Sequence, residues 1–86
     1  MNLYYVKSLT GLWDKWTENH PRVKEYLHMN DVGGIPKGRL NMGEYLLCID
    51  DTITPLGEGY HRKYTKLFVN GSGNVGYADI EYLGKV

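Results

Sequence analysis

The chain has 86 residues, enough for one domain (residues 1–86) but not for a large hydrophobic core. Eleven glycines and eight tyrosines favour strands and turns over a helical bundle, and no segment has a disordered or low-complexity composition. Ten basic residues balance ten acidic residues, which excludes an overall electrostatic field that would attract the protein to nucleic acid or to an anionic membrane.

The first third of the chain predicts a strand followed by a partly helical insertion. Residues 3–9 are rich in β-forming side chains and precede a Thr-Gly break, as expected of a first strand. Trp13 and Trp16 lie three positions apart within residues 12–19, where a helical turn would place both indoles on one face. Residues 21–29 begin with proline and have apolar side chains at i, i+3 and i+4, which predicts a second short helix.

The middle of the chain predicts turns on either side of one strand. Residues 30–34 contain Asn, Asp and two Gly, which are typical of a helix end, and they lead into an extended Ile35-Pro36. Residues 44–49 predict a strand. Two aspartates, a proline and two glycines in residues 50–59 then indicate a long loop.

The last third of the chain predicts a β-hairpin. Alternate residues of its first strand have the period of two that a half-buried strand shows, and we expect three of them to form the core face: Thr65, Leu67 and Val69. The residues between them, including Phe68, would face outward. Residues 70–74 concentrate Gly and Asn, which suits a five-residue hairpin loop.

The residues after this loop predict the closing strand. Val75, Tyr77 and Ile80 resume the apolar pattern, and Gly76 indicates either a bulge or the close approach of another backbone. Residues 82–83 would pack against the first strand. Together these elements predict a mainly β chain with minor α content, folded as one small antiparallel barrel with a partly helical insertion in its first long loop.

The order of these parts resembles the small Src-homology-3-type (SH3) barrels, especially the bacterial variety. In that family a strand, a long first loop, a Gly-preceded strand, an aromatic-led strand, a Gly-containing hairpin and a Gly-aromatic strand succeed one another. The matching segments here are LYYVKSLTGLW, GRLNMGEYLLCID, YTKLFVNG and VGYADIEYL. Two features depart from the family: Tyr64 stands where a Trp often leads the third strand, and the insertion between Trp13 and Gly34 is long.

The resemblance implies a binding surface made of aromatic side chains. Such barrels often bind peptides or protein loops between the first loop and the third-strand hairpin. The matching aromatics here are Tyr64, Tyr77 and Tyr82, with Trp13 and Trp16 on the opposite wall. Aromatic side chains suit this task because they offer a large rigid contact area with a polar tip. Packing is the alternative explanation of the same residues and the commoner role for them, with the tyrosines in the barrel wall and the tryptophans as a lid on the core.

A second interpretation of the sequence is nucleic-acid binding through a local basic patch. The residues that suggest it are Arg39, Tyr60, Arg62, Lys63 and Lys66. Their cations would contact phosphates while the tyrosine stacks on bases. Asp50, Asp51 and Glu58 precede the second basic run and would neutralise part of its charge.

The sequence predicts neither catalysis nor a metal site. A thiol nucleophile needs a nearby base, but Cys48 lies in the apolar run 46–49, where we expect an inert buried thiol. The three histidines lack the spacing of a zinc site. No glycine motif for phosphates opens a helix. We therefore expect a protein that is not an enzyme and has no metal and no cofactor.

Other features of the sequence bear on the compartment. The longest apolar run, residues 45–49, is far shorter than the roughly 20 residues that cross a bilayer. The N-terminal residues show no leader pattern, and a single cysteine forms no disulfide framework. We expect a cytoplasmic protein that does not associate with membranes.

The function predicted from the sequence is recognition of a larger protein partner. A module of this size without chemistry of its own would act as an adaptor or as an inhibitor that covers the partner's surface, in the manner of phage or mobile-element accessory proteins. The alternatives are the nucleic-acid-binding barrel described above and a self-assembling structural component. Self-assembly would use the first strand or the face around Phe68.

Overall fold

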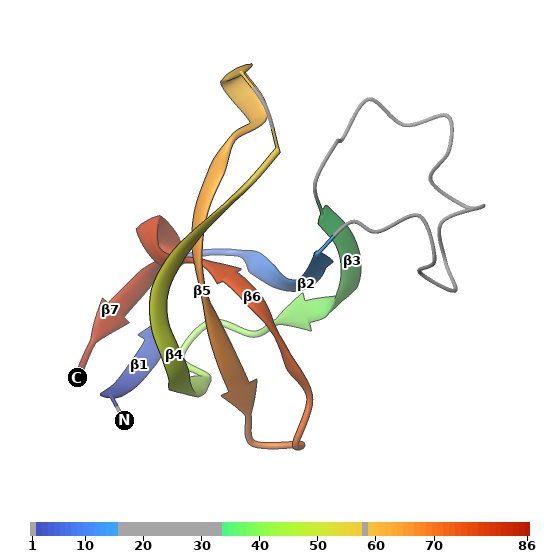
Figure 1. Ribbon diagram of the computed structural model, residues 1–86. Helices are drawn as coiled ribbons and strands as arrows, with labels where there is room; N and C mark the ends of the chain where they lie inside the picture. Colours follow the sequence, from blue (N-terminus) through green and yellow to red (C-terminus); the bar gives the residue numbers. More distant parts are fainter. Residues whose placement is uncertain (1, 16–33, 58) are drawn as a thin grey trace.

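The computed structural model describes residues 2–15, 34–57 and 59–86 (Figure 1). This part of the chain forms β1 (Asn2–Val6), β2 (Thr10–Lys15), β3 (Gly34–Leu40), β4 (Tyr45–Leu56), the 3₁₀ turn η1 (Gly59–His61), β5 (Lys63–Asn70), β6 (Val75–Asp79), the 3₁₀ turn η2 (Ile80–Tyr82) and β7 (Leu83–Lys85). All seven strands belong to one antiparallel sheet in the order β3-β2-β6-β5-β4-β1-β7. The described residues contain no α-helix, and the prediction of a mainly β chain is confirmed.

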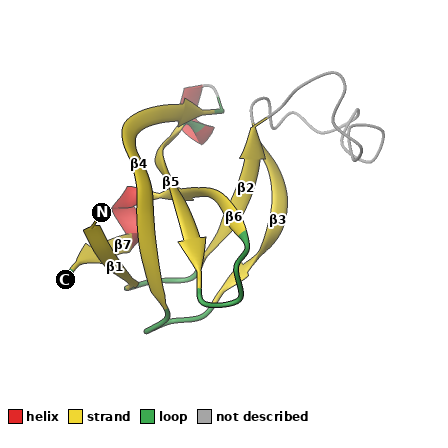
Figure 2. Cartoon of the chain, turned by 60° about the horizontal axis from the view of Figure 1, so that its bottom comes forward, coloured by secondary structure: helices red, strands yellow, loops and turns green. Residues whose placement is uncertain are grey.

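The long strand β4 connects the two halves of the sheet. Near its start it pairs with β1, where Leu46 lies opposite Tyr4, and along its length it pairs with β5. The register between β4 and β5 shifts on both sides of Asp50, and such irregularities bend a strand. Figure 2 shows the resulting arrangement, with β1, β7 and β4 towards one side of the molecule, β2 and β3 at the other, and β5 and β6 between them.

β4 is longer than the sequence predicted. The expected loop over residues 50–59 is wrong for most of its length, because β4 continues to Leu56, which lies opposite Lys63 of β5. The turn-forming aspartates are accommodated inside the strand. The Asp50 carboxylate accepts a hydrogen bond from the backbone N–H of Thr52 (2.9 Å) within the irregular part of the register. Pairing with β5 thus outweighs the local turn signal.

The first hairpin also corrects the sequence interpretation. Residues 10–15 form β2, antiparallel to β3, so the helical turn predicted around Trp13 is wrong in the described residues. Trp13 pairs with Pro36 instead, across a register shift next to Leu12. The three-residue spacing of the tryptophans carried no information about this non-local partner. Trp16 and the helix predicted over residues 21–29 lie outside the described residues.

The core fills the inner face of the curved sheet. Its buried members come from every strand, with Ile80 packed against them: Tyr4, Val6, Leu12, Leu40, Leu46, Cys48, Phe68, Ala78 and Leu83. Phe68 is fully buried, and its ring meets the ring of Tyr4 edge-on, with the centroids 5.2 Å apart and an interplanar angle of 82°. This arrangement is favourable for aromatic pairs.

The core face predicted for β5 is wrong at Leu67 and Val69. Phe68 points inward, and these two residues are half-buried on the outer face. Thr65 is buried as predicted, and its hydroxyl donates to the Thr54 carbonyl oxygen (2.6 Å). Apolar side chains occupy both faces of this strand. Burial passes from one alternate set at Thr65 to the other at Phe68, so the period of two did not show which side of the strand is enclosed.

The hairpin that follows β5 agrees with the sequence. Residues 70–74 connect β5 to β6, and the Asn70 side chain accepts hydrogen bonds from the N–H groups of Ser72 (3.0 Å) and Asn74 (2.9 Å). On β6, small Gly76 and Ala78 face the core, whereas Val75 is exposed. The expected apolar face of β6 is therefore wrong at Val75.

Gly76 and Leu83 are where the sequence placed close contacts. A Cβ atom on Gly76 would lie 3.0 Å from the Leu12 Cβ and 3.2 Å from the Trp13 carbonyl oxygen, so the predicted close approach of another backbone is confirmed. Leu83 is buried and pairs with Val6, which confirms that the end of the chain packs against the first strand. Tyr82, its neighbour in η2, remains exposed.

Candidate functional site

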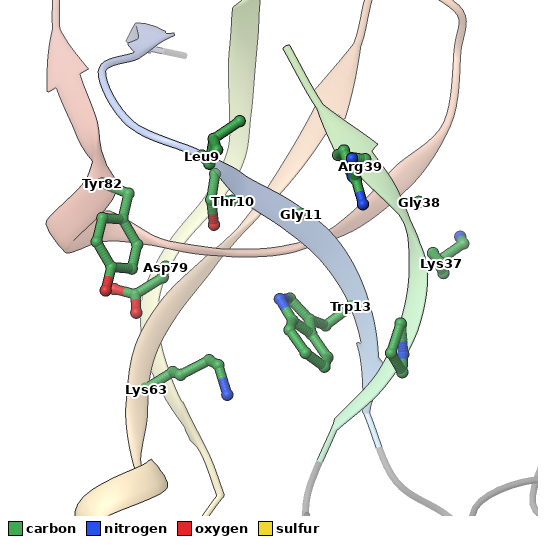
Figure 3. A pocket seen from close by; sticks show the side chains of 11 residues that line it. Leu9, Thr10, Gly11, Trp13, Lys37, Gly38, Arg39, Lys63, Asp79 and Tyr82 are labelled. Atoms are coloured by element: carbon green, nitrogen blue, oxygen red, sulfur yellow. The ribbon is translucent and has the colours of Figure 1, made fainter. Parts of the chain in front are cut away.

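Two cavities of similar size share the buried side chain of Asp79. The first, which we call the tryptophan groove, has a volume of about 540 Å³ (Figure 3). Its lining comes from the first hairpin, the start of β5 and the region of η2: Leu9, Thr10, Gly11, Trp13, Pro36, Lys37, Gly38, Arg39, Lys63, Asp79 and Tyr82. Figure 3 shows Tyr82 and Asp79 on one side, Lys37 and Arg39 on the other, and Trp13 between them.

Trp13 is held in the tryptophan groove by its neighbours on two strands. Its indole is half-buried, and the ring atom Cε3 would lie 3.2 Å from a Cβ on Gly34, so the absence of a side chain at Gly34 makes room for the ring. The ammonium of Lys63 lies 4.5 Å from the ring centroid, a cation–π geometry. The aromatic surface and the positive charge are therefore adjacent in the groove.

Among the residues that the structure describes, the tryptophan groove has more unpaired positive charge than negative charge. Lys37 forms an ion pair with Asp14 (3.5 Å) and also donates to the Val75 carbonyl oxygen. Arg39 and Lys63 make no ion pair with a carboxylate of the described residues. Asp79 is buried, and it is the N-cap residue of η2, because its Oδ1 accepts a hydrogen bond from the Glu81 N–H (3.0 Å). The accessible charge in the groove is therefore cationic.

The second cavity, which we call the tyrosine groove, has a volume of about 560 Å³. Its lining combines apolar side chains with charged ones: Tyr4, Ile53, Arg62, Tyr64, Lys66, Asp79, Ile80, Glu81, Leu83 and Lys85. Lys66 forms an ion pair with Asp51 (3.1 Å) and also lies 3.5 Å from the hydroxyl oxygen of Tyr4. The hydrogen bond between Lys66 and Asp51 raises the pKa of the lysine and lowers the pKa of the carboxyl group. The charge of Lys66 is therefore already compensated.

The structure distributes the predicted aromatic residues over several places. Trp13 and Tyr82 line the tryptophan groove, whereas Tyr64 lines the tyrosine groove. Tyr77 lines neither of these two grooves and is half-buried on β6, opposite Trp13 in the register. Trp16 lies outside the described residues. Among the described members of the predicted set, Trp13 therefore lies with Tyr82 in one groove and opposite Tyr77 across the pairing of β2 with β6.

The predicted basic patch is divided in the same way. Arg39 and Lys63 line the tryptophan groove, and Arg62 and Lys66 line the tyrosine groove. Tyr60, in η1, is fully exposed and lines neither groove. Consecutive residues of a strand point to opposite sides, and Arg62 and Lys63 show the same separation where β5 begins.

Sequence reasoning did not assign Leu9 and Asp79 to a site. Leu9 is 72% exposed beside β2, and this exposure places an aliphatic side chain at the rim of the tryptophan groove. A leucine in a short connection gives no sequence signal for such a role. Asp79 was likewise not assigned to a site, although an aspartate that precedes a turn is a typical capping residue.

Cys48 is enclosed, as the sequence suggested. Its Sγ lies 3.4 Å from the Asp50 carbonyl oxygen and 3.6 Å from the Asp51 carboxylate, and burial raises the pKa of the thiol. Within residues 2–15, 34–57 and 59–86, no group of three or more His, Cys, Asp and Glu side chains is placed to hold a metal ion. The same residues include no helix long and apolar enough to span a membrane.

Comparisons with known proteins complete the description of the site. No protein-family model, no curated protein and no solved structure matches this chain. The side chains that line the two grooves are therefore the basis on which a function is proposed.

Proposed function

We propose that this protein is a small SH3-like barrel that recognises an extended segment of a larger protein in the tryptophan groove. Its element order supports the fold part of the proposal. A first strand, a long hairpin (β2–β3), a long strand (β4), a second hairpin (β5–β6), a 3₁₀ turn (η2) and a closing strand that pairs with the first follow one another along the chain. This is also the order of the segments on which the resemblance is based.

The observation that carries the function is the indole of Trp13 in an open groove, with Lys63 over its ring. A half-buried indole offers a flat apolar surface at little entropic cost, because it has few rotatable bonds. Tyr82 and Leu9 extend this surface on the rim of the groove. Proline and aliphatic side chains of an extended peptide pack well on such surfaces, since the peptide loses little conformational freedom on binding.

The charge of the tryptophan groove specifies the peptide further. Arg39 and Lys63 present positive charge beside the indole without a described carboxylate as partner. A glutamate or aspartate next to the apolar residue of the peptide would form charge-assisted hydrogen bonds there. The partner segment is therefore an extended apolar peptide flanked by an acidic residue. We assign binding rather than chemistry to this groove, so the protein acts as an adaptor or inhibitor, in the manner of an accessory protein.

Selection from a displayed library of random peptides tests the proposal, followed by affinity measurements for the enriched peptides. The selected peptides should combine an apolar residue with an acidic one. Tyr82→Ala should weaken their binding at least about tenfold, equivalent to about 1.4 kcal/mol. Lys63→Ala should weaken it and reduce its dependence on salt. Tyr60→Ala is the matched control, because Tyr60 is fully exposed and lines neither groove.

Two results would contradict the proposal. Peptides whose affinity is unchanged by Tyr82→Ala and Lys63→Ala would bind elsewhere on the molecule. Binding of single-stranded oligonucleotides that weakens steeply with salt would favour the second interpretation of the sequence, in which the cations that contact phosphates are Arg39, Arg62, Lys63 and Lys66.

A further inference from the structure

The outer face of the sheet carries a continuous cross-strand row of aliphatic side chains. Leu3 lies opposite Leu47, Leu47 opposite Val69, and Val69 opposite Val75. The row continues at the other end, because the N–H of Val86 donates to the Leu3 carbonyl oxygen (3.0 Å). Directly opposite residues place their side chains on the same face of a sheet. The row therefore crosses the whole width from β6 to the end of the chain.

Further apolar residues flank this row on both sides. Tyr5 pairs with Tyr45 on one side, and Leu67 pairs with Tyr77 on the other. The Tyr5 ring covers Gly84, because a Cβ on that glycine would lie 2.3 Å from the ring atom Cζ. We call this set of six aliphatic residues and three tyrosines the aliphatic face: Leu3, Tyr5, Tyr45, Leu47, Leu67, Val69, Val75, Tyr77 and Val86.

The aliphatic face is accessible and uncharged. Leu3 is 41% exposed, Tyr45 60% and Val86 69%, and the remaining members are exposed or half-buried. None of the nine side chains is acidic or basic. Soluble proteins seldom leave a large contiguous apolar patch uncovered, and such patches mark interaction surfaces.

The size of the aliphatic face suits the centre of a protein interface. A tyrosine side chain contributes about 150–250 Å² when fully buried, so Tyr5 and Tyr45 expose on the order of 100 Å² each. Nine side chains at that exposure would offer about 900 Å², and because four of them are only half-buried the face approaches the about 800 Å² that each partner buries in a standard interface. Interfaces have an apolar centre with a polar rim, and the surrounding residues would supply that rim.

We propose that the aliphatic face is the interface of a symmetric dimer of this chain. A twofold axis brings the same patch of both copies together, which requires a self-complementary surface. An uncharged aliphatic row meets this requirement without opposing like charges. The net charge of zero also means that two copies do not repel each other over longer distances. Two sheets would pack face to face about 10 Å apart, as in a β-sandwich.

The aliphatic face adjoins the tryptophan groove without sharing its lining, because Tyr77 lies opposite Trp13 in the register. None of the nine residues lines the tryptophan groove or the tyrosine groove. A dimer would therefore present two copies of each groove, and a partner with two matching segments would be bound with increased avidity. This surface includes Leu3 and Tyr5 of the first strand, which the sequence interpretation also named for self-assembly, but it does not include Phe68, which is fully buried.

Sedimentation velocity over a concentration series from about 1 µM to about 1 mM tests the dimer. The mass of the wild-type protein should rise from 9.9 kDa towards twice that value. Leu47→Lys and Val75→Lys each place a positive charge in the row. In a twofold-symmetric dimer the same lysine of the second copy lies in the same interface, so the two charges repel each other. Each substitution should weaken dimerisation at least about a hundredfold.

Met42→Lys is the matched control, because Met42 is an exposed apolar residue in the turn between β3 and β4. This variant should dimerise like the wild type. Val75 is exposed, so Val75→Lys decides the test if Leu47→Lys disturbs the fold. Three results would overturn the proposal: a wild-type protein that stays monomeric throughout, a dimer that persists in Val75→Lys, or open-ended assembly in place of a dimer.

Discussion

Phe68 and Val69 are neighbours on β5 that face opposite sides of the sheet, so substituting each in turn measures which side is the core. Phe68 is fully buried against the ring of Tyr4. Phe68→Ala should cost about 3–5 kcal/mol of unfolding free energy, a large part of the about 4–13 kcal/mol expected for a domain of this length. Phe68→Leu keeps most of the volume and should cost about 1–3 kcal/mol, including the lost aromatic pair.

Val69→Ala should cost less than either Phe68 variant. It removes two carbons at about 0.8 kcal/mol each when fully buried, and Val69 is only half-buried, so about 1 kcal/mol or less is expected. Urea denaturation at about 1 µM protein measures these differences where a weak dimer is dissociated. A loss for Val69→Ala that equals or exceeds that for Phe68→Leu would refute the assignment of the core face.

Three local contacts give further predictions. Gly84→Ala should destabilise the fold by about 1–3 kcal/mol, because its Cβ would collide with the Tyr5 ring. In calorimetry, Tyr5→Ala introduced into the Gly84→Ala variant should lower the stability less than Tyr5→Ala does in the wild-type protein. Asn70→Ala should cost about 1–2 kcal/mol in thermal unfolding, since it removes the acceptor of two loop N–H groups, whereas Asn70→Asp keeps that acceptor. The pKa of Asp51 is lowered by Lys66, so the ion pair stabilises the fold above pH 3.8 and is lost as the pH falls through the lowered value; Asp51→Asn should flatten this acid dependence in urea titrations.

The second hairpin was predictable because its determinants are local. Residues 70–74 have the Asn and Gly composition that a tight loop requires, and Gly73 adopts a φ of +83° there. Gly76 signalled a close approach, since a glycine within a strand pattern often marks a place where another backbone comes near. Both inferences used only neighbouring residues and known backbone preferences.

The first hairpin and the end of β4 depend on non-local pairing and were not predictable in the same way. The spacing of Trp13 and Trp16 fits a helical turn, but β3 supplies a partner strand on which Trp13 pairs with Pro36. Asp50 and Asp51 favour a loop, but β5 continues to pair beyond them as far as Leu56. In both places the hydrogen bonds of a distant strand outweigh the local preference.

The candidate site was predictable in its residue types and less so in its grouping. The resemblance to SH3-type barrels named Trp13 and Tyr82, which line one groove although they come from opposite ends of the chain. It also named Tyr64, which lines the other groove, while the adjacent Lys63 lies over Trp13. A shift of one residue along a strand exchanges the two faces, and sequence similarity alone does not determine to which face a given side chain points.

The misassigned core face and the proposed dimer have one physical origin. β5 carries apolar side chains on both faces, with Phe68 inward and Leu67 and Val69 outward. Strands that are apolar on both faces normally lie between two layers of protein. In this molecule the inner layer is its own core, and the outer layer is not supplied by the described residues, because the row from Leu3 to Val75 is left accessible. A second copy of the chain packed on this row would supply that missing layer, and none of the nine residues that it would cover lines the tryptophan groove.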